Sequence, residues 1–466
     1  MAIITKYCLT YKMNENEHLL INTVTGALDI IDTPSLNLIN EVKAGNSDAI
    51  SKKSQLYSDL QKRGYLFETP KDELALLQKV KSYSDFLYNN SFPTEFIILP
   101  TLGCNLRCTY CFEDDAQHVN HCKMTKEQLE GILKYIKEIK ESHKEILEKN
   151  KQKLKIRIFG GEPLLPGNKE LVIRILEFSR DNNVEVNIVS NGTLVDYYME
   201  TLVEFKDVIN LQITLDGQKD IHDKRRIRAD GKGTFDAICK NITKLIDNNI
   251  RIALRVNVDA ENISGINEIE KIIIDNQWNK HGYVIPYFSP VVDFSGTSTT
   301  VLEESELLEG LLKSGYKTDG SSTFKSVVSP CIGYLNMFFN PHSKHKFCKT
   351  HYCGATSKNE LCFSPDGLVT SCITYSGKGK HSIGTFDENG VTFDQEAYLA
   401  WTDRNVFKIQ KCGNCKYAFL CGGGCPIKAI DQNGSMENVV CSDIKSTIDT
   451  YVNEVVIPTL TAGESA

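Results

Sequence analysis

Three cysteines, Cys104, Cys108 and Cys111, lie within eight residues of one another in the first quarter of the chain. Their spacing is Cys-x3-Cys-x2-Cys, and the aromatic Tyr110 stands directly before the third cysteine. Three thiolates at this spacing can bind three irons of a cubane iron–sulfur cluster, which leaves the fourth iron without a protein ligand. Zinc sites and ordinary ferredoxin clusters usually take four protein ligands. The missing ligand therefore indicates an iron that can bind a small molecule, with a zinc knuckle and a distant fourth ligand as the alternative.

The C-terminal part of the chain is unusually rich in cysteine, because ten of the 16 cysteines fall between Cys331 and Cys441. Five of them follow the spacing Cys-x2-Cys-x5-Cys-x3-Cys-gap-Cys, and two more lie on either side of Gly367. In chain order these seven are Cys353, Cys372, Cys412, Cys415, Cys421, Cys425 and Cys441. Residues 422–424 are all glycine, which allows the backbone to bend around sulfur atoms. The pattern predicts a second metal-binding region.

Two simpler explanations of the C-terminal cysteines compete with iron–sulfur clusters. A disulfide framework needs an oxidising compartment, whereas the sequence shows no signal peptide and predicts a cytoplasmic protein with reduced thiols. A zinc ribbon would use Cys412, Cys415, Cys421 and Cys425 and would leave the other spacings unexplained. The iron–sulfur interpretation accounts for all seven residues, and we prefer it.

Together, the triad and the seven C-terminal cysteines resemble the radical S-adenosylmethionine (radical SAM) enzymes that carry a C-terminal SPASM domain. The resemblance implies that Cys104, Cys108 and Cys111 hold a [4Fe–4S] cluster, and that its open iron chelates the amino and carboxylate groups of S-adenosylmethionine. It also implies two auxiliary [4Fe–4S] clusters, which makes three clusters in all.

The family order also implies ligands for the auxiliary clusters. Cys412, Cys415, Cys421 and Cys441 would hold the second auxiliary cluster, and Cys353, Cys372 and Cys425 would hold the first. Cys348 resembles the extra cysteine of some family members and is the expected fourth ligand of the first cluster. Cys331 and Cys362 are rival candidates, and a substrate cysteine could also take an open site.

A Gly-Gly-Glu motif follows the second strand that we expect in the central region. Its two glycines allow a strand end to approach a ligand closely, and its carboxylate can pair with an ammonium group. The resemblance implies that Gly160, Gly161 and Glu162 hold the methionine amine of the cofactor.

Polar residues end the next three strands as well. Ser190 and Asn191 suit a ribose, although Asn191 or Thr193 could instead cap a helix. Asp216 lies in a Leu-Asp-Gly segment that resembles one in the family. Arg255 and Asn257 share one face of the fifth strand because strand side chains alternate. The resemblance implies cofactor contacts for these residues, and a buried salt bridge is the alternative for Arg255.

Other polar residues lie nearby without an assigned role. His222 and Arg225 or Arg226 follow Asp216 near the expected rim of the active site. The sequence does not identify a general base.

The central region alternates apolar strands with helical patterns, from residue 93 to about 290. The expected strands are 95–99, 154–159, 184–189, 209–215, 251–258 and 283–288. Thr125 and Gln128 form a capping-box pattern before the first helix, and further helical patterns occupy 168–180, 193–205, 234–248, 265–275 and 303–314. Six repeats predict a parallel sheet that is too small for an eight-unit barrel. The resemblance implies an α/β fold with a partial (β/α)6 TIM-like barrel.

The N-terminal residues form a separate pattern of short strands and helices. The expected strands are 7–12, 19–22 and 28–31, with 65–67 as a further candidate. Thr33-Pro34 suggests the cap and first residue of one helix, and a second helix is expected over 48–63. This pattern resembles the winged-helix-like recognition element of many peptide-modifying radical enzymes, which bind a leader peptide as an extra strand. A plain capping domain is the alternative.

The expected domain organisation follows from these segments. Residues 1–88 form the recognition element, 93–290 the radical SAM partial barrel, 291–345 a bridging region at the substrate entrance, and 346–466 the SPASM domain. A chain of 466 residues is long enough for two or three domains. A net charge of −7 argues against nucleic-acid binding, and no apolar run is long enough to span a membrane.

This layout resembles the thioether-forming (sactipeptide and ranthipeptide) peptide maturases. It implies a precursor peptide as substrate, bound by its leader at the N-terminal domain, and a flavodoxin- or ferredoxin-type electron donor. Carbon–carbon or carbon–oxygen crosslinking shares every motif and remains an alternative. So does an anaerobic sulfatase maturase, although that family places an aspartate where Ile373 follows Cys372. A non-catalytic iron–sulfur electron carrier would need neither the open triad nor the Gly-Gly-Glu motif.

Overall fold

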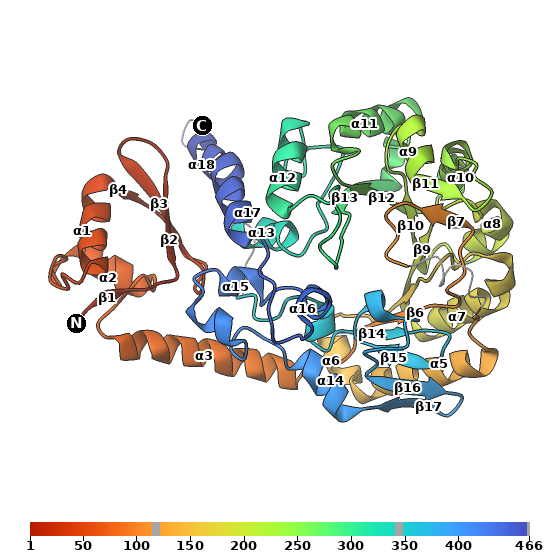
Figure 1. The fold of residues 1–466 in the computed structure, drawn as a ribbon, viewed down its shortest axis with the longest axis horizontal. Coiled ribbons are helices and arrows are strands. Elements are labelled where there is room, and N and C mark those ends of the chain that lie inside the picture. Colours follow the sequence, from red (N-terminus) through yellow and green to blue (C-terminus); the bar gives the residue numbers. More distant parts are fainter. Residues whose placement is uncertain (114–121, 341–347, 464–466) are drawn as a thin grey trace.

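The computed structural model describes residues 1–113, 122–340 and 348–463 (Figure 1). Residues 341–345 of the expected bridging region, and 346–347 and 464–466 of the expected SPASM domain, lie outside them. An N-terminal segment lies at the left of Figure 1 and the parallel strands with their helices lie at the right. Residues 418–463 lie between these two parts in this view, whereas residues 360–393 lie at the lower right, next to the parallel strands. No helix in the described part of the chain is long and apolar enough to cross a membrane.

The centre of the molecule is a ten-stranded mixed sheet with the order β13-β12-β10-β9-β8-β6-β14-β15-β16-β17. Six consecutive neighbours are parallel and confirm the six expected strands. They are β6 (Glu95–Ile98), β8 (Lys155–Ile158), β9 (Glu185–Ser190), β10 (Ile209–Thr214), β12 (Ile252–Val258) and β13 (Val284–Pro290). The carboxyl ends of parallel strands meet at one edge of the sheet, where ligands bind in folds of this kind.

Alternation along these strands produces two different faces. Residues such as Ile156, Ile158 and Ile213 are fully buried in the main hydrophobic core. Their neighbours Arg157 and Gln212 point to the other face, which lines a cavity. The apolar face therefore stabilises the sheet and leaves the opposite face free to carry polar groups.

The helices after the strands lie around the outside of the parallel sheet (Figure 1). They are α5 (Lys126–Ser142), α6 (Lys144–Lys149), α7 (Lys169–Asn182), α8 (Val195–Glu204), α9 (Lys219–Arg225), α10 (Phe235–Asp247), α11 (Ile266–Asp275) and α12 (Glu304–Lys313). The predicted capping box is confirmed, because the Thr125 side chain accepts a hydrogen bond from the Gln128 backbone N–H and the Gln128 side chain accepts one from the Thr125 N–H. The predicted helix at 193–205 begins only at Val195.

The N-terminal segment contains a three-stranded antiparallel sheet and three helices. Its strands are β1 (Ile3–Ile4), β2 (Cys8–Lys12), β3 (Glu17–Asn22), β4 (Leu28–Asp32) and β5 (Leu66–Phe67), and β2-β3-β4 form the sheet while β1 pairs with β5. Its helices are α1 (Thr33–Lys43), α2 (Gln55–Lys62) and α3 (Pro70–Asn89). The sheet confirms the three predicted strands.

Three predictions for this segment need correction. Asp32, not Thr33, caps α1, because its carboxylate accepts a hydrogen bond from the Ser35 N–H. The helix expected over 48–63 begins only at Gln55, after its cap Ser54. The 20-residue helix α3 was not predicted. It carries few buried side chains of its own and runs from the N-terminal segment toward the C-terminal segment along the bottom of Figure 1.

The C-terminal segment extends the central sheet, which the sequence did not predict. β14 (Glu360–Phe363) pairs in parallel with β6, and β15 (Leu368–Thr370), β16 (Gly384–Asp387) and β17 (Gly390–Phe393) follow in antiparallel order. The remaining helices are α13 (Ile332–Phe339), α14 (Gln395–Thr402), α15 (Ala418–Cys421), α16 (Pro426–Asn433), α17 (Ile444–Tyr451) and α18 (Ile457–Gly463). This pairing brings the C-terminal segment next to the first parallel strand.

Candidate active site

A cavity of about 340 Å³ lies at the carboxyl ends of the parallel strands. All three cysteines of the triad line it, together with Gly160 and Gly161. Polar wall residues come from four strand ends and include Ser190, Asn191, Arg255 and Asn257. Ile373 and Thr374, which directly follow Cys372, close the cavity from the C-terminal segment. The structure therefore brings most of the predicted cofactor residues together around the triad.

The triad is held by a short pair of strands. β7 (Leu106–Cys108) pairs in antiparallel register with β11 (Arg226–Arg228), and Cys108 stands opposite Arg226. The Thr109 N–H also donates to the carbonyl of Arg225 at 3.0 Å. Burial raises the pKa of the Cys111 thiol to about 12, and the charge of Glu113 adds to the rise. These thiols would need a cationic partner such as iron to ionise at neutral pH.

The Gly-Gly pair packs against the backbone that leads into the cysteine loop. A Cβ atom on Gly160 would overlap the carbonyl oxygen of Thr101, and one on Gly161 would overlap that of Gly103. Gly160 also has a φ of 120°, which disfavours other residues. The glycines are thus needed for the contact between the end of β8 and the cysteine loop.

Glu162 lies fully buried behind this turn. Its carboxylate accepts hydrogen bonds from the Leu164 N–H at 2.9 Å, the Ser190 hydroxyl at 2.8 Å and the Asn191 N–H at 2.7 Å. Burial raises its pKa, and these hydrogen bonds oppose the rise. Glu162 therefore ties the end of β8 to the end of β9, and its contact with a cofactor ammonium stays a prediction.

Asn191 connects the end of β9 to the cysteine loop. Its amide donates to Asn105 at 2.8 Å and lies 4.0 Å from the Cys104 sulfur. Asn105, which the sequence analysis missed, donates in turn to Thr193 at 2.9 Å. The helix-cap alternative is wrong, because Leu194 stands at the cap position of α8 and the Asn191 side-chain oxygen accepts from Thr193 instead.

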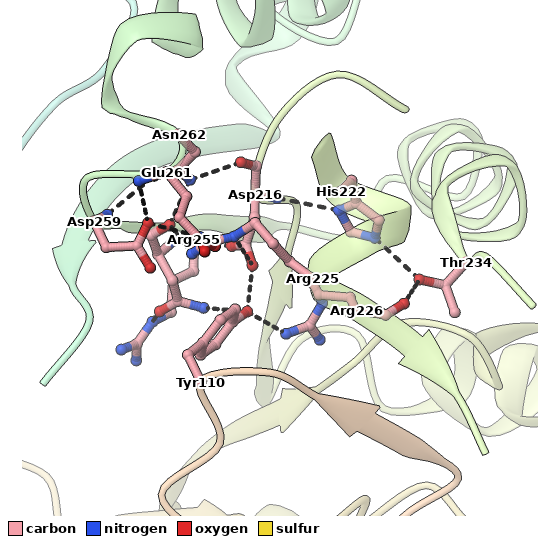
Figure 2. A network of polar contacts seen from close by, with 11 residues as sticks. Tyr110, Asp216, His222, Arg225, Arg226, Thr234, Arg255, Asp259, Glu261 and Asn262 are labelled. Atoms are coloured by element: carbon pink, nitrogen blue, oxygen red, sulfur yellow. Dashed lines mark hydrogen bonds and ion pairs between the residues drawn. The ribbon is translucent and has the colours of Figure 1, made fainter. Parts of the chain in front are cut away.

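Tyr110 is the centre of a polar network beside the triad (Figure 2). Its hydroxyl donates to the Asp216 carboxylate. The same oxygen accepts hydrogen bonds from Arg226 at 2.8 Å and from the Asn257 amide at 3.0 Å. Residues from three strand ends thereby hold the aromatic ring that precedes Cys111.

Two arginines in this network have different surroundings. Arg225 forms ion pairs with Asp259 at 2.6 Å and Glu261 at 3.1 Å. Arg255 donates to neutral oxygens of Asn257 and Ser289, at 2.7 and 2.9 Å, and the residues that the structure describes offer it no ion pair. Among the described residues the salt-bridge alternative for Arg255 therefore finds no carboxylate partner, and Arg255 lines the cavity.

His222 lies behind the same network and does not line the cavity. Its Nδ1 accepts a hydrogen bond from the Asp216 N–H at 3.2 Å, and its Nε2 lies 3.0 Å from the Thr234 hydroxyl. Burial, followed by the charges of Arg226 and Arg225, lowers the pKa of His222 well below its usual value. The imidazole is neutral and serves as a structural link.

The sequence pattern of the Radical SAM superfamily matches residues 98–273, from the end of β6 into α11. Residues 98–273 therefore form a Radical SAM domain, and the protein is an enzyme. It is 26% identical to a cysteine-type anaerobic sulfatase-maturating enzyme of Clostridium novyi (strain NT), over 76% of this chain and 93% of the relative. It is 22% identical to the radical SAM cyclopropyl synthase TigE of Paramaledivibacter caminithermalis, over 96% of this chain and 94% of that protein.

Solved structures of two radical SAM enzymes share the fold. The structure of anSMEcpe with bound AdoMet and the Kp18Cys peptide has a TM-score of 0.59 at 19% identity, and covers 80% of this chain and all of that one. Streptococcus suis SuiB bound to S-adenosylmethionine has a TM-score of 0.55 at 17% identity, and covers 95% and 99% of the two chains. This enzyme thus has the α/β fold of that superfamily with a large mixed sheet.

Radical SAM enzymes use S-adenosylmethionine and a [4Fe–4S] cluster, and the cavity fits both groups. Its three thiols line it from one loop, and polar groups with the guanidinium of Arg255 surround the space beside them. In the described ranges no group of three or more His, Cys, Asp or Glu side chains is packed for a single metal ion. Each cysteine of a cubane cluster binds a different iron, so its ligands lie further apart than those of one zinc ion.

The C-terminal cysteines of the enzyme form two groups, which contain the same residues as the two predicted ligand sets. Burial raises the pKa of Cys412 to about 11, and the charges of its neighbours add to the rise. Those neighbours are Cys415, Cys421 and Cys441. Cys353 has Cys425 as a neighbour, and Cys372 has Cys353. That either group binds a cluster stays a prediction.

The three candidates for a further ligand lie in different places. The Cys348 thiol donates to the carbonyl of Val24 at 2.8 Å and packs near Cys412. Cys331 is buried beside Cys421, whereas Cys362 is buried beside Cys372. The proximity of Cys362 to the first group could not be read from spacing, because it depends on the pairing of β14 with β6.

Proposed function

We propose that this enzyme is a peptide maturase that installs thioether crosslinks between cysteine sulfur and carbon in a ribosomally made precursor peptide. One observation supports it most: the cavity borders both the triad and Ile373 and Thr374, which directly follow Cys372. A peptide residue in this cavity would lie between the cofactor site and the first C-terminal cysteine group. The solved structures of similar enzymes with a bound peptide or precursor peptide also support a peptide substrate.

The proposal includes the domain organisation expected from the sequence. Residues 1–88 act as the winged-helix-like recognition element, 93–290 as the partial (β/α)6 barrel, 291–345 as the bridging region and 346–466 as the SPASM domain. Val291, Val292 and Phe294 of the bridging region line the cavity and support its place at the substrate entrance.

Three [4Fe–4S] clusters belong to the proposal. Cys104, Cys108 and Cys111 hold the first of them. The C-terminal groups hold two auxiliary clusters, with Cys348 as the proposed extra ligand and Cys362 as the rival next to Cys372. When bound, S-adenosylmethionine and its reduced cluster supply a 5′-deoxyadenosyl radical, which removes a hydrogen atom from the substrate.

The protein's own residues position these groups and exclude water. Gly160 and Gly161 shape the wall behind the cofactor, and Arg255 and Asn257 offer hydrogen-bond donors across the cavity. Ser190, Asn191 and Asp216 hold the strand ends in place. Glu162 would hold the methionine amine of the cofactor, either by direct contact or through the backbone that it fixes.

The leader peptide would bind at the N-terminal segment. β4 is an edge of its three-stranded sheet and carries the exposed Ile30, so a peptide strand could extend the sheet there. A flavodoxin- or ferredoxin-type protein would supply the electrons. Deleting residues 1–88 should weaken binding of the full precursor and spare cofactor cleavage without substrate. Equal precursor affinity would leave the segment only a structural role.

An anaerobic sulfatase-maturase-like oxidase is the second candidate, and the similarity to sulfatase-maturating enzymes favours it. The residue after Cys372 counts against it. That position carries the aspartate base in the family that the sequence resembles, whereas Ile373 here presents an aliphatic side chain to the cavity.

The mass and thiol content of the product test these alternatives. A thioether crosslink removes two hydrogens and one alkylatable thiol, and both losses should survive reduction and alkylation. Mass loss with every thiol still alkylatable would indicate carbon–carbon or carbon–oxygen crosslinking. An aldehyde trapped by hydrazine would indicate formylglycine and the sulfatase-maturase activity.

A further inference from the structure

Arg226 is a buried cation in the wall of the active site without an assigned role. The residue is only 6% exposed and lines the same cavity as the triad. The register of β7 and β11 places it directly opposite Cys108. Its position is thus fixed by backbone pairing with the strand that carries a predicted cluster ligand.

The guanidinium of Arg226 is held mainly by one residue. Its Nη1 donates to the Tyr110 hydroxyl at 2.8 Å (Figure 2), and its buried Nε has no hydrogen-bond partner among the described residues. No carboxylate of the described chain lies within ion-pair distance of it, whereas the neighbouring Arg225 is neutralised by Asp259 and Glu261. Arg226 reaches the Asp216 carboxylate only through the Tyr110 hydroxyl. Its charge therefore remains available to the triad.

We propose that Arg226 is a fixed cation that makes the cluster bound by Cys104, Cys108 and Cys111 easier to reduce, with Tyr110 and Asp216 setting its position. Reduction adds one electron from an external donor, and hence one negative charge, to the thiolate-bound cluster. A guanidinium held nearby stabilises that charge, and burial strengthens the effect because little water screens it.

The inference concerns this chain's residues and the cluster common to radical SAM enzymes. It does not depend on the peptide that the enzyme modifies.

The test is a redox titration of the whole iron-loaded enzyme, followed by electron paramagnetic resonance. The signal that changes on adding S-adenosylmethionine identifies the cluster of the triad. At one fixed solution potential, Arg226→Gln should lower the ratio of reduced to oxidised cluster about tenfold, which is 59 mV for one electron. Arg226→Lys keeps the charge and should stay within about twofold of the natural enzyme.

Arg228→Gln is the matched control, because it removes the same charge from the same strand opposite Leu106 and outside the cavity lining. Its ratio should equal that of the natural enzyme. If Arg226→Gln keeps its iron and its ratio is unchanged, or if the Lys and Gln variants fall equally, the inference is wrong. If the Arg226→Gln variant loses its iron, Asp216→Asn is the variant that tests the inference. Removal of this anion should raise the ratio, and an equal or lower ratio would overturn the inference.

Discussion

The two cysteine regions of this enzyme are built differently. The triad lies on a loop that is fixed by the pairing of β7 with β11 and by the Tyr110 network. The second C-terminal group lies among short turns, with the four-residue helix α15 and glycines of positive φ at 422, 423 and 424. Regular backbone pairing shapes the first site, whereas the second has little secondary structure of its own.

The second C-terminal cysteine group is instead held by hydrogen bonds from the N-terminal segment. Lys6 donates to the carbonyl of Gly413 at 2.8 Å, and the Thr23 hydroxyl donates to that of Lys416 at 3.0 Å. Both acceptors lie in the loop that carries Cys412 and Cys415. The difference suggests that the triad keeps its shape without metal, while the second C-terminal group depends on bound iron and on this contact.

The largest expected effect comes from removing the triad thiols. Replacing Cys104, Cys108 and Cys111 together with Ala should abolish cleavage of S-adenosylmethionine. About eight iron atoms should remain, those of two auxiliary [4Fe–4S] clusters. Iron analysis and assay of 5′-deoxyadenosine measure both outcomes. Unchanged iron, or continued 5′-deoxyadenosine formation, would show that the triad is not a separate site.

Loss of the second C-terminal group should loosen the N-terminal segment. In a Cys412→Ser, Cys415→Ser variant the loop loses its iron, so the hydrogen bonds from Lys6 and Thr23 should weaken. Two such bonds contribute about 1–3 kcal/mol, and amide exchange in β2 and β3 should become at least about fivefold faster. Hydrogen–deuterium exchange measures this, with the triad variant as the control. Equal protection in both variants would refute the proposed dependence.

The next effect concerns the wall behind the triad. Glu162→Gln places an amide N–H₂ among three donors, so one buried hydrogen bond is lost and unfolding should become about 1–3 kcal/mol easier. If the carboxylate also faces the cofactor ammonium, S-adenosylmethionine should bind one to two decades more weakly. Ser190→Ala removes one donor to the same carboxylate and leaves the charge, so it measures how far the loss of a single hydrogen bond in this wall lowers the affinity. Affinity equal to that of the Ser190→Ala variant would restrict Glu162 to a structural role.

The sequence predicted the parts whose signals are local. Apolar runs located the six parallel strands, Thr125 and Gln128 located the start of α5, and the cysteine spacing located the triad. The Gly-Gly-Glu motif was found as well. Its glycines nevertheless contact the cysteine loop, which a list of motifs does not reveal.

The missed features depend on contacts between distant residues. β14 joins β6 although some 260 residues separate them, and β11 is a three-residue strand that carries two arginines. β11 has no apolar pattern of its own, and the short apolar run of β14 does not reveal its partner. Ser84 is the one buried residue of helix α3, so the sequence of this helix shows only a weak apolar stripe. Contacts with the C-terminal segment hold the helix in place. Such elements form because of contacts with distant parts of the chain, which their own sequences do not reveal.

The smallest expected effect is a dependence of the free energy of unfolding on pH, which comes from His222 in the network beside the triad. His222 stays neutral in the folded enzyme because its pKa lies well below 6.5, while in the unfolded chain it takes up a proton as the pH falls through about 6.5. Its contribution to stability is therefore fully present above pH 6.5 and is lost below it, by about 1.4 kcal/mol per pH unit until the folded pKa is reached. Urea unfolding at several pH values should show this slope, and His222→Gln should remove it. Equal slopes for the two proteins would mean that His222 is protonated in place, and that the network around Asp216 tolerates a third cation beside Arg225 and Arg226.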